Sequence, residues 1–302
     1  DMTLCGATEA RNVIKLTNAH HVRIRNCEIY GWSRVGVPRF DLPEGGKYYS
    51  SKSSTSAINS DPAININTGC QGIVVERCYI HDPLGRSSSW YYSHPAGPQA
   101  VMMYKPDHTT VLRYNDFVGS DQHRWNDAVE SSGNFHLDGG FNREADVYGN
   151  YMSYCDDDCI ELDGGMQNVR CFGNRFENAL CGVSIQGCMV SPTYVFDNLF
   201  SGMADEQNLT GQTIKTDTQN GSDDPIAYVW GNRLMGRGSG MTMRPTLIAK
   251  ATDNELFDSN KIGDASGGKT GSVNENNVAC GASTDWDATP APCDRCRSFF
   301  RA

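Results

Sequence analysis

A short phrase that recurs along the chain constrains its fold more than any other feature of the sequence. Each copy sets an asparagine among apolar residues, as in Phe172-Gly173-Asn174-Arg175-Phe176. The copies are centred on Asn26, Asn115, Asn150, Asn174, Asn198 and Asn232. Three consecutive copies are spaced 24 residues apart, and the longer intervals elsewhere imply insertions. Self-similarity with a period of roughly 20–50 residues is typical of proteins built from stacked repeats.

A second set of segments alternates apolar and polar residues, and successive side chains of a strand point to opposite faces. The segments cover residues 12–17, 63–67, 100–104, 128–132, 159–163, 182–186, 211–215 and 240–244. Aligned, they give two inward columns, namely Ile14, Ile64, Val101, Val129, Ile160, Val183, Gln212, Met241 and Leu16, Ile66, Met103, Ser131, Leu162, Ile185, Ile214, Met243. Only Gln212 and Ser131 interrupt these apolar columns, and a slip of one residue would turn every side chain to the other face. The pattern predicts an all-β fold, a parallel β-helix with long loop insertions.

The outward columns of the same alignment collect the charged residues. They contain Lys15, Asn65, Met102, Glu130, Glu161, Ser184, Thr213, Thr242 and Thr17, Asn67, Tyr104, Ser132, Asp163, Gln186, Lys215, Arg244. Stacked strands lie about 4.8 Å apart, so Glu130 and Glu161 are expected to be neighbours, as are Asp127 and Asp158. Lys215 and Arg244 lie further along, which predicts a groove with an acidic centre and a basic end.

Acids are most concentrated in the stretch Cys155–Gly165. Five carboxylates lie within eight residues there: Asp156, Asp157, Asp158, Glu161 and Asp163. Neighbouring carboxylates resist ionising together, so such a cluster points to a cation, a proton or a sugar as its partner. We expect the groove to be lined by Glu130, Asp163, Gln186, Lys215 and Arg244 as substrate-binding residues.

Long inserts are expected to surround this groove, since binding groups often lie on loops that a rigid scaffold carries. The insert over residues 120–141 contains His123 and His136, which we count among the substrate-binding candidates, with a solvated loop residue as the alternative for each. The insert over residues 81–98 contains Trp90, Tyr91 and Tyr92. Aromatic side chains beside carboxylates suit the faces of sugars, although simple loop packing explains them equally well.

The acidity of the chain argues against two classes of partner. Its net charge is −10, with 36 acidic and 26 basic residues, and its isoelectric point is about 5.1. Nucleic acids and anionic membrane surfaces attract basic proteins, so we expect neither. There is no apolar run of about 18 residues, the length that a transmembrane helix needs, so we expect no membrane insertion.

The twelve cysteines bear on compartment and on the C-terminal region. An even and high count predicts disulfide bonds in an oxidising compartment, and therefore a secreted, extracellular protein. Zinc is the alternative for Cys293 and Cys296, but no second pair with matching spacing accompanies them. We expect a single β-helix domain over residues 1–302, with 263–302 forming a less regular, cysteine-containing coil and tail.

The segments that carry the acids resemble the polygalacturonase-like glycoside hydrolases, which belong to the pectin-lyase-like right-handed parallel β-helix superfamily. That family has four motifs on consecutive coils: Asn-Thr-Asp-Gly, Gly-Asp-Asp-Cys-Ile, Gly-His-Gly and Arg-Ile-Lys. The corresponding segments here are Trp125–Val129, Asp156–Ile160, Leu180–Ile185 and Thr213–Lys215. Cys181 stands where the family has its His, and Thr213 where it has its Arg. The resemblance implies a right-handed β-helix that binds and cleaves a polysaccharide or oligosaccharide.

The resemblance also implies a mechanism, single-step inverting hydrolysis. Asp157 is then the general acid, while Asp127 and Asp158 activate a water on the opposite face of the sugar. Such a reaction requires roughly 6.5–9.5 Å between acid and base, and crowding keeps one carboxyl protonated near neutral pH. Glu161 and Glu130 are the alternative acid/base candidates, because the alignment points their side chains outward.

Other functions remain open at this stage. A lyase or epimerase on the same scaffold would need a basic residue beside a uronate neutralised by calcium or arginine. A non-enzymatic β-helix that forms a fibre or coat, or that binds glycans, is the other alternative, since exposed ends of stacked strands favour self-association. We expect no cofactor; Asp156–Asp158 capping turns or binding a structural calcium ion is the alternative to catalysis. Lys215 would bind substrate or balance charge.

Overall fold

The structure is a computed structural model that describes residues 2–7, 10–34, 60–91, 94–216 and 224–282. Within these residues every regular element is a β-strand, apart from a 3-10 helix at Ala265–Gly267. The strands form one 17-stranded sheet and one 9-stranded sheet, and neighbouring strands run parallel. The predicted all-β class with stacked parallel strands is confirmed, and the arrangement is compatible with a β-helix.

The nine-stranded sheet contributes one strand from each turn of the chain. In sequence order its strands are β3 (Arg23–Arg25), β6 (Gln71–Glu76), β9 (His108–Arg113), β12 (Asp146–Tyr148), β14 (Val169–Phe172), β16 (Thr193–Phe196), β19 (Ile226–Trp230), β22 (Ile248–Thr252) and β25 (Val273–Glu275). Each strand pairs with the next member of this series. The order of the strands in this sheet is therefore the order of the repeats in the sequence.

The 17-stranded sheet consists of two rows that share the long strands β13 (Tyr151–Glu161) and β15 (Arg175–Ser184). One row, called the site row below, also contains β2 (Ile14–Leu16), β5 (Asp61–Ile66), β8 (Pro98–Met103), β11 (Val129–Ser131), β18 (Ile214–Lys215), β21 (Gly240–Met241) and β24 (Lys261–Ile262). The other row contains β1 (Met2–Cys5), β4 (Cys27–Tyr30), β7 (Tyr79–His81), β10 (Asp116–Val118), β17 (Leu199–Ser201), β20 (Arg233–Leu234), β23 (Glu255–Phe257) and β26 (Val278–Gly281).

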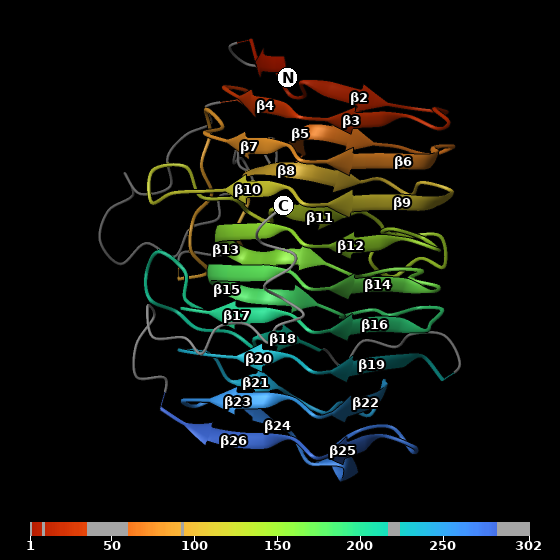
Figure 1. Cartoon of the computed structure of the whole chain (residues 1–302), viewed down its shortest axis with the longest axis vertical. Helices are drawn as coiled ribbons and strands as arrows, with labels where there is room; N and C mark the ends of the chain where they lie inside the picture. Colours follow the sequence, from red (N-terminus) through yellow and green to blue (C-terminus); the bar gives the residue numbers. More distant parts are fainter. Residues whose placement is uncertain (1, 8–9, 35–59, 92–93, 217–223, 283–302) are drawn as a thin grey trace.

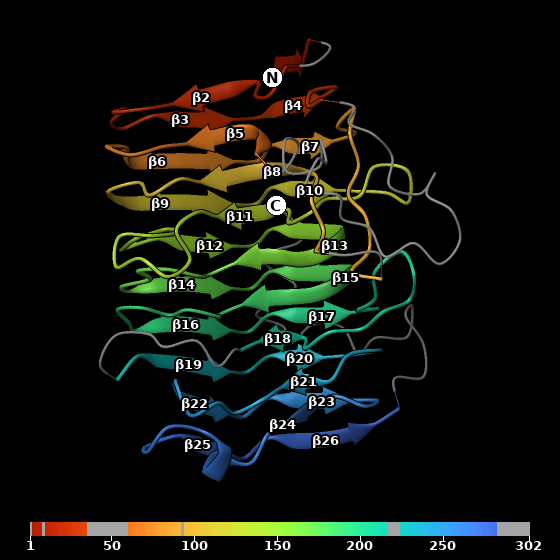
Figure 2. The same cartoon turned by 180° about the vertical axis from the view of Figure 1, so that it is seen from behind.

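Successive turns of the chain stack along the long axis of the molecule. Strand β2 pairs with β5, β3 with β6 and β4 with β7, so each coil visits the site row, the nine-stranded sheet and the other row in turn. Figures 1 and 2 show the coils descending from β2 at one end to β25 and β26 at the other. The strands β11, β13, β15 and β18 lie in the middle of this stack, and β11 and β13 carry most of the acids singled out from the sequence.

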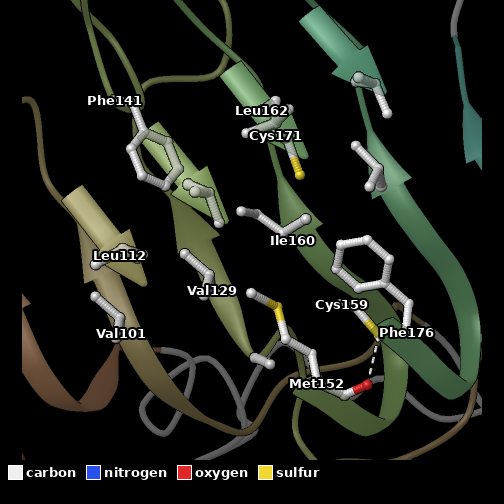
Figure 3. Close-up of a cluster of buried hydrophobic side chains, with 14 of the residues drawn as sticks. Val101, Leu112, Val129, Phe141, Met152, Cys159, Ile160, Leu162, Cys171 and Phe176 are labelled. Carbon is white, nitrogen blue, oxygen red and sulfur yellow. Dashed lines mark hydrogen bonds between the residues drawn. The ribbon is translucent and has the colours of Figure 1, made fainter. Parts of the chain in front are cut away.

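Apolar residues that were predicted to point inward form the core between the sheets. Ile64, Val101, Val129 and Ile160 pair in turn across adjacent strands, and all four are fully buried. Figure 3 shows Val101, Val129 and Ile160 among the side chains that meet in this interior. Burying an aliphatic side chain contributes roughly 1.5–3 kcal/mol, so each coil stabilises the coils beside it.

The recurring asparagines form a hydrogen-bonded ladder. Asn174 shows the pattern: its Nδ2 donates to Val147 O at 2.9 Å and to Asn198 Oδ1 at 3.0 Å, and its Oδ1 accepts from the backbone N of Asn150 at 3.0 Å. The members are Asn115, Asn150, Asn174, Asn198, Asn232, Asn254 and Asn277. Buried polar groups are costly unless hydrogen-bonded, and each asparagine here satisfies backbone groups of the adjacent coils.

Asn26 was predicted to be the asparagine of one repeat, and this prediction is wrong. Arg25 pairs with Glu76, which places Asn26 level with Arg77, one residue before the ladder position that Cys78 occupies. Asn26 and Arg77 have φ of 51° and 52°, in the left-handed region that Asn tolerates better than most residues. Asn26 therefore lies in the turn that precedes the ladder position, and its side chain is exposed to solvent.

The alignment of residues 211–215 was wrong by two positions. It placed Gln212 against Val183, whereas the structure pairs Ile214 with Val183 and Lys215 with Ser184. A shift of two residues preserves which side chains face inward, so the alternation of apolar residues could not detect it. The polar Gln212 in an apolar column was the visible sign of the error, and the shift brings Lys215 level with the acids.

Candidate functional site

Two successive coils carry the same Asp-x-x-Glu spacing, and they create a two-by-two arrangement of acids. Asp127 lies two residues before β11 and Glu130 is the middle residue of β11, while Asp158 and Glu161 lie near the end of β13. Val129 pairs with Ile160, so the aspartates lie level with each other and so do the glutamates. These four residues are called the carboxyl array below.

Hydrogen bonds join the two halves of the carboxyl array. The backbone N of Asp158 donates to Asp127 Oδ1 at 2.8 Å, and the backbone N of Ser131 donates to Glu161 Oε2 at 2.9 Å. Each bond runs from a side chain on one coil to the backbone of the other. The positions of these carboxyl groups are thus fixed by the same parallel pairing that forms the sheet.

Two amide side chains border the array, and both were missed as site residues. Gln99 Nε2 donates to Glu130 Oε2, and Asn126 Nδ2 donates to Asp127 Oδ2 at 2.5 Å. Gln99 precedes the small residue Ala100, the position that Asp127 has before Ala128. Asp127 and Asp158 occupy this position on two successive coils, so examining the same position on the preceding coil would have identified Gln99.

Lys215 supplies the positive charge in contact with the array. Its Nζ lies 2.5 Å from Asp158 Oδ2 and 3.6 Å from Asp157 Oδ1. Burial lowers the pKa of this ammonium, but the charges of Asp158 and then Asp157 outweigh burial and raise the pKa well above its usual value. Lys215 therefore belongs to the acidic centre, and not to the basic end that the two-residue alignment error suggested.

A local irregularity brings Asp157 to the same ammonium as Asp158. The pairing of β13 with β15 shifts register between Cys155 and Asp158, and Asp158 pairs with Cys181. A bulge bends a strand and redirects its side chains. This explains how consecutive aspartates, which would alternate in a regular strand, both approach Lys215.

The array is a place where carboxyl groups retain protons. Burial raises the pKa of Asp158 to about 6, and burial together with the charge of Asp158 raises the pKa of Glu161 to about 8. Burial, followed by the charge of Glu161, holds the pKa of Asp127 and of Glu130 well above the ordinary range. Protonated and ionised carboxyl groups therefore coexist within a few ångströms near neutral pH.

Asp156 lies apart from the array and serves the structure. Its Oδ1 accepts from Arg124 Nε at 2.7 Å, and Arg124 is 3 % exposed. The same guanidinium donates to the backbone O of Asn178 at 3.2 Å and of Ala204 at 3.3 Å. Arg124 thus joins three segments that lie far apart in the sequence, with Asp156 as its counter-ion.

The remaining predicted binding residues have varied surroundings. Both oxygens of Asp163 accept from Ser184 Oγ, at 2.9 and 3.1 Å, and Asp163 is buried, as its raised pKa reflects. Gln186 follows two residues after Ser184 and is half-buried, and its backbone N donates to Ser184 Oγ at 3.3 Å. Arg244 is half-buried beyond β21 and forms no ion pair with another described residue.

The two histidines contact none of the array acids through a described hydrogen bond or ion pair. His136 is exposed on the segment 133–139, whose Asn134 donates to Glu161 Oε1 at 3.3 Å. His123 closes a tight turn with Ser120, each backbone N–H donating to the carbonyl of the other. The structure therefore gathers Asp127, Asp157, Asp158, Glu161, Glu130 and Lys215 at one place.

A metal ion is one species that the array could accommodate. Asp127, Asp158 and Glu161 each offer one oxygen, and these oxygens lie within 4.8 Å of one another. Calcium takes roughly six to eight oxygen ligands, so three carboxylates make up about half of such a set. Asp156, which the calcium alternative included, is committed to Arg124.

The predicted disulfide bonds are absent from the described residues. Ten cysteines are free thiols: Cys5, Cys27, Cys70, Cys78, Cys155, Cys159, Cys171, Cys181, Cys188 and Cys280. Cys155 and Cys159 come close, but their sulfurs are 3.7 Å apart, well beyond the roughly 2.05 Å of a disulfide. Seven of the ten are buried and behave as small apolar side chains. Cys293 and Cys296 lie outside the described residues.

No family model, curated protein or solved structure matches the chain. No helix among the described residues is long and apolar enough to cross a membrane. The geometry of the carboxyl array is therefore the basis on which a function can be argued.

Proposed function

We propose that the protein is a secreted glycoside hydrolase that degrades a polysaccharide by an inverting mechanism on a right-handed parallel β-helix. The observation that carries the proposal is the carboxyl array with Lys215 at its edge. Glycoside hydrolysis needs a protonated carboxyl group and an ionised one on either side of a sugar bond. The raised pKa values of Glu161 and Asp158 support both states near neutral pH.

In the proposed mechanism, Asp127 and Asp158 hold the attacking water, and Asp158, which has the less strongly raised pKa, accepts its proton. Their carboxyl groups are neighbours across the two coils, and the ammonium of Lys215 favours the ionised form of Asp158. Asp157, whose Oδ1 lies 3.6 Å from the same ammonium, donates the proton to the leaving oxygen. Glu161 is the rival proton donor, because a pKa of about 8 leaves it protonated at neutral pH.

The state of Lys215 argues against a lyase. Removing a proton beside a uronate carboxylate needs an unprotonated base, and two aspartates keep Lys215 protonated, so Lys215 cannot be that base. Array carboxyl groups can exchange protons near neutral pH, which is the requirement for hydrolysis. The hydrolase therefore fits the described residues better than the lyase.

The direct test is incubation with a panel of neutral and acidic polysaccharides. We expect new reducing ends without the absorbance near 235 nm that unsaturated products would show, and NMR should detect inversion at the new anomeric carbon. Retention of configuration would reject the inverting mechanism. Unsaturated products would reject hydrolysis altogether.

Variants then identify the proton donor. Replacing the general acid should reduce kcat by about 10²-fold or more, so Asp157→Asn and Glu161→Gln are compared. We expect Asp157→Asn to show the larger loss with substrates whose leaving group needs protonation. Asp146→Asn, which disrupts an ion pair with Arg170 on the nine-stranded sheet, is the matched control and should retain activity. If Asp157→Asn is fully active, the assignment is wrong.

A further inference from the structure

Acids outnumber bases on the face that carries the carboxyl array, and the bases in contact with them are already engaged. Lys215 lies between Asp158 and Asp157. Arg124 is buried against Asp156. Within the described part of the chain, neither cation is left to pair with a carboxylate on an incoming sugar.

An anionic sugar would therefore meet the negative charges of those array acids that ionise, with Asp158 ionised at neutral pH. Repulsion between like charges is screened weakly where water is scarce, and the array acids are mostly buried. Recognition of a carboxylate usually relies on a guanidinium that can donate two hydrogen bonds. Thr213, which precedes β18, offers no substitute, because it is buried and shares a 2.5 Å hydrogen bond with Asn260. Arg244, the guanidinium without an ion pair among the described residues, follows β21 on the next coil and does not contact the array through a described hydrogen bond or ion pair.

A neutral sugar, by contrast, supplies hydrogen-bond donors to carboxyl oxygens that have no partner. Asp157 Oδ1 and Asp158 Oδ1 are buried and have no hydrogen-bond partner among the described residues. A carboxyl group keeps acceptor capacity whether it is ionised or, as proposed for Asp157, protonated. Sugar hydroxyl groups are uncharged donors, so they satisfy these oxygens without adding negative charge.

An aromatic surface lies on the loop that borders the same coils. Trp90 is 39 % exposed and Tyr91 is 59 % exposed, although the three serines before them are buried. The loop is fixed because the backbone N of Ser87 donates to Arg124 O at 3.0 Å and the backbone N of Ser89 donates to Glu206 Oε1 at 3.1 Å. Exposed rings on a fixed backbone offer apolar faces to the C–H groups of a sugar at little entropic cost.

We propose that the substrate is a neutral glycan and that Trp90 and Tyr91 form its aromatic contact. The inference rests on the proposed function, since it names the substrate class for the same site. It excludes uronate-rich chains as preferred substrates. It also assigns a binding role to two side chains outside the carboxyl array.

Pairs of polymers with one backbone and different charge test the substrate class: hydroxyethyl with carboxymethyl cellulose, debranched xylan with glucuronoxylan, and esterified with de-esterified pectin. At low salt we expect cleavage of the neutral member of at least one pair to be about tenfold faster or more, and added salt should narrow the difference. Equal or faster cleavage of the acidic members would overturn the inference.

Affinity electrophoresis with the same polymers separates this inference from the proposed hydrolase. If nothing is cleaved but neutral polymers retard the protein more than acidic ones, the hydrolase is rejected and the substrate class is supported as a ligand class. If neither kind of polymer is cleaved or retards the protein, both proposals are overturned.

The aromatic contact is tested with W90A/Y91A. We expect KM to rise about fivefold to tenfold while kcat stays within about twofold, because the rings bind ground state and transition state alike. Tyr79→Ala is the matched control, since Tyr79 is 41 % exposed on β7, in the other row. A thermal melt checks folding, and Trp90→Tyr should restore much of the affinity. An unchanged KM in the folded double variant would overturn the aromatic contact.

Discussion

Asp158 and Glu161 show how strongly a residue's chemistry depends on its surroundings. In the unfolded chain both are ordinary carboxyl groups with pKa values of 3.8 and 4.5, and in the folded chain the values are about 6 and 8. Burial is the larger cause in each case, and the charge of Lys215 keeps the Asp158 value the lower of the two. Two acids three residues apart can thus differ in protonation at one pH.

Lys215→Met should remove the charge that holds Asp158 ionised. The pKa of Asp158 then rises further, so the acidic limb of the pH–activity profile moves to higher pH. We expect kcat to fall by about 10²-fold at pH 6, consistent with loss of a base in its working form. The measurement is the pH profile of kcat on whichever polymer proves to be the substrate.

Lys250→Met provides the control for that experiment, because Lys250 lies on the nine-stranded sheet and its ammonium contacts only the backbone of Gly271 among the described residues. Its pH profile should match that of the unmodified protein. A Lys215→Met profile with an unmoved acidic limb would show that Asp158 is not the titrating base.

The Arg124–Asp156 pair should behave as a buried ion pair. Asp156→Leu breaks the buried ion pair and leaves the guanidinium with the exposed Asp121, 3.1 Å away, as its remaining counter-ion; breaking a buried pair typically costs about 3–5 kcal/mol. We expect a clear fall in Tm, and we expect Arg124→Met combined with Asp156→Leu to recover much of it. A Tm for the double variant no higher than for the Asp156→Leu variant would contradict this description.

At the scale of the element, the asparagine ladder is the device that fixes the distance between turns. Asn174 donates to Val147 O and Asn198 Oδ1, and it accepts from the backbone and the side chain of Asn150. Each of these partners belongs to a neighbouring coil. Removing one asparagine therefore leaves donors and acceptors without partners on two coils at once.

Asn174→Ala should cost about 3 kcal/mol, because several buried polar groups lose their partners at about 1 kcal/mol or more each. Asn26→Ala removes the same side chain from an exposed turn and should cost about 1 kcal/mol, mainly through its left-handed backbone. Urea unfolding of both variants gives the comparison. Equal losses would show that the ladder adds no stability of its own.

The sequence predicts which residues of a strand face the core wherever buried and exposed residues alternate. The core column through Val129 and Ile160 follows from alternation alone, and so does the contact between Glu130 and Glu161. The residue of β15 that pairs with Lys215 could not be predicted. A shift of two residues leaves the same side chains pointing inward, and only the packing between coils distinguishes the correct register from the shifted one. Gln99 and Asn126 were missed because amides carry no charge that would mark them as site residues.

At the scale of the whole molecule, the raised pKa values make stability depend on pH. The folded protein binds protons at Asp158 and Glu161 more tightly than the unfolded chain does, so their contribution is fully present below about pH 4 and is lost as pH rises towards 8. We expect Tm to fall by several degrees between pH 5 and pH 8. Differential scanning calorimetry in matched buffers measures it.

Glu161→Gln is the informative variant for that experiment. A glutamine cannot ionise, so the fall in Tm between pH 5 and pH 8 should become smaller. Glu255→Gln is the control, because Glu255 is a half-buried partner of Arg233 far along the stack. If Glu161→Gln leaves the pH dependence unchanged, the titrating groups lie elsewhere.

The carboxyl array has a practical consequence for structure determination. Proteins often trade stability for activity at their working sites, and four acids packed across two coils are a clear source of such tension. Replacing Glu130 and Glu161 with glutamine keeps the hydrogen bonds from Gln99 and Ser131 in reach while removing mutual repulsion. We expect a more stable protein, and adding Asp157→Asn, which removes the proposed proton donor, should leave a bound glycan uncut for structure determination.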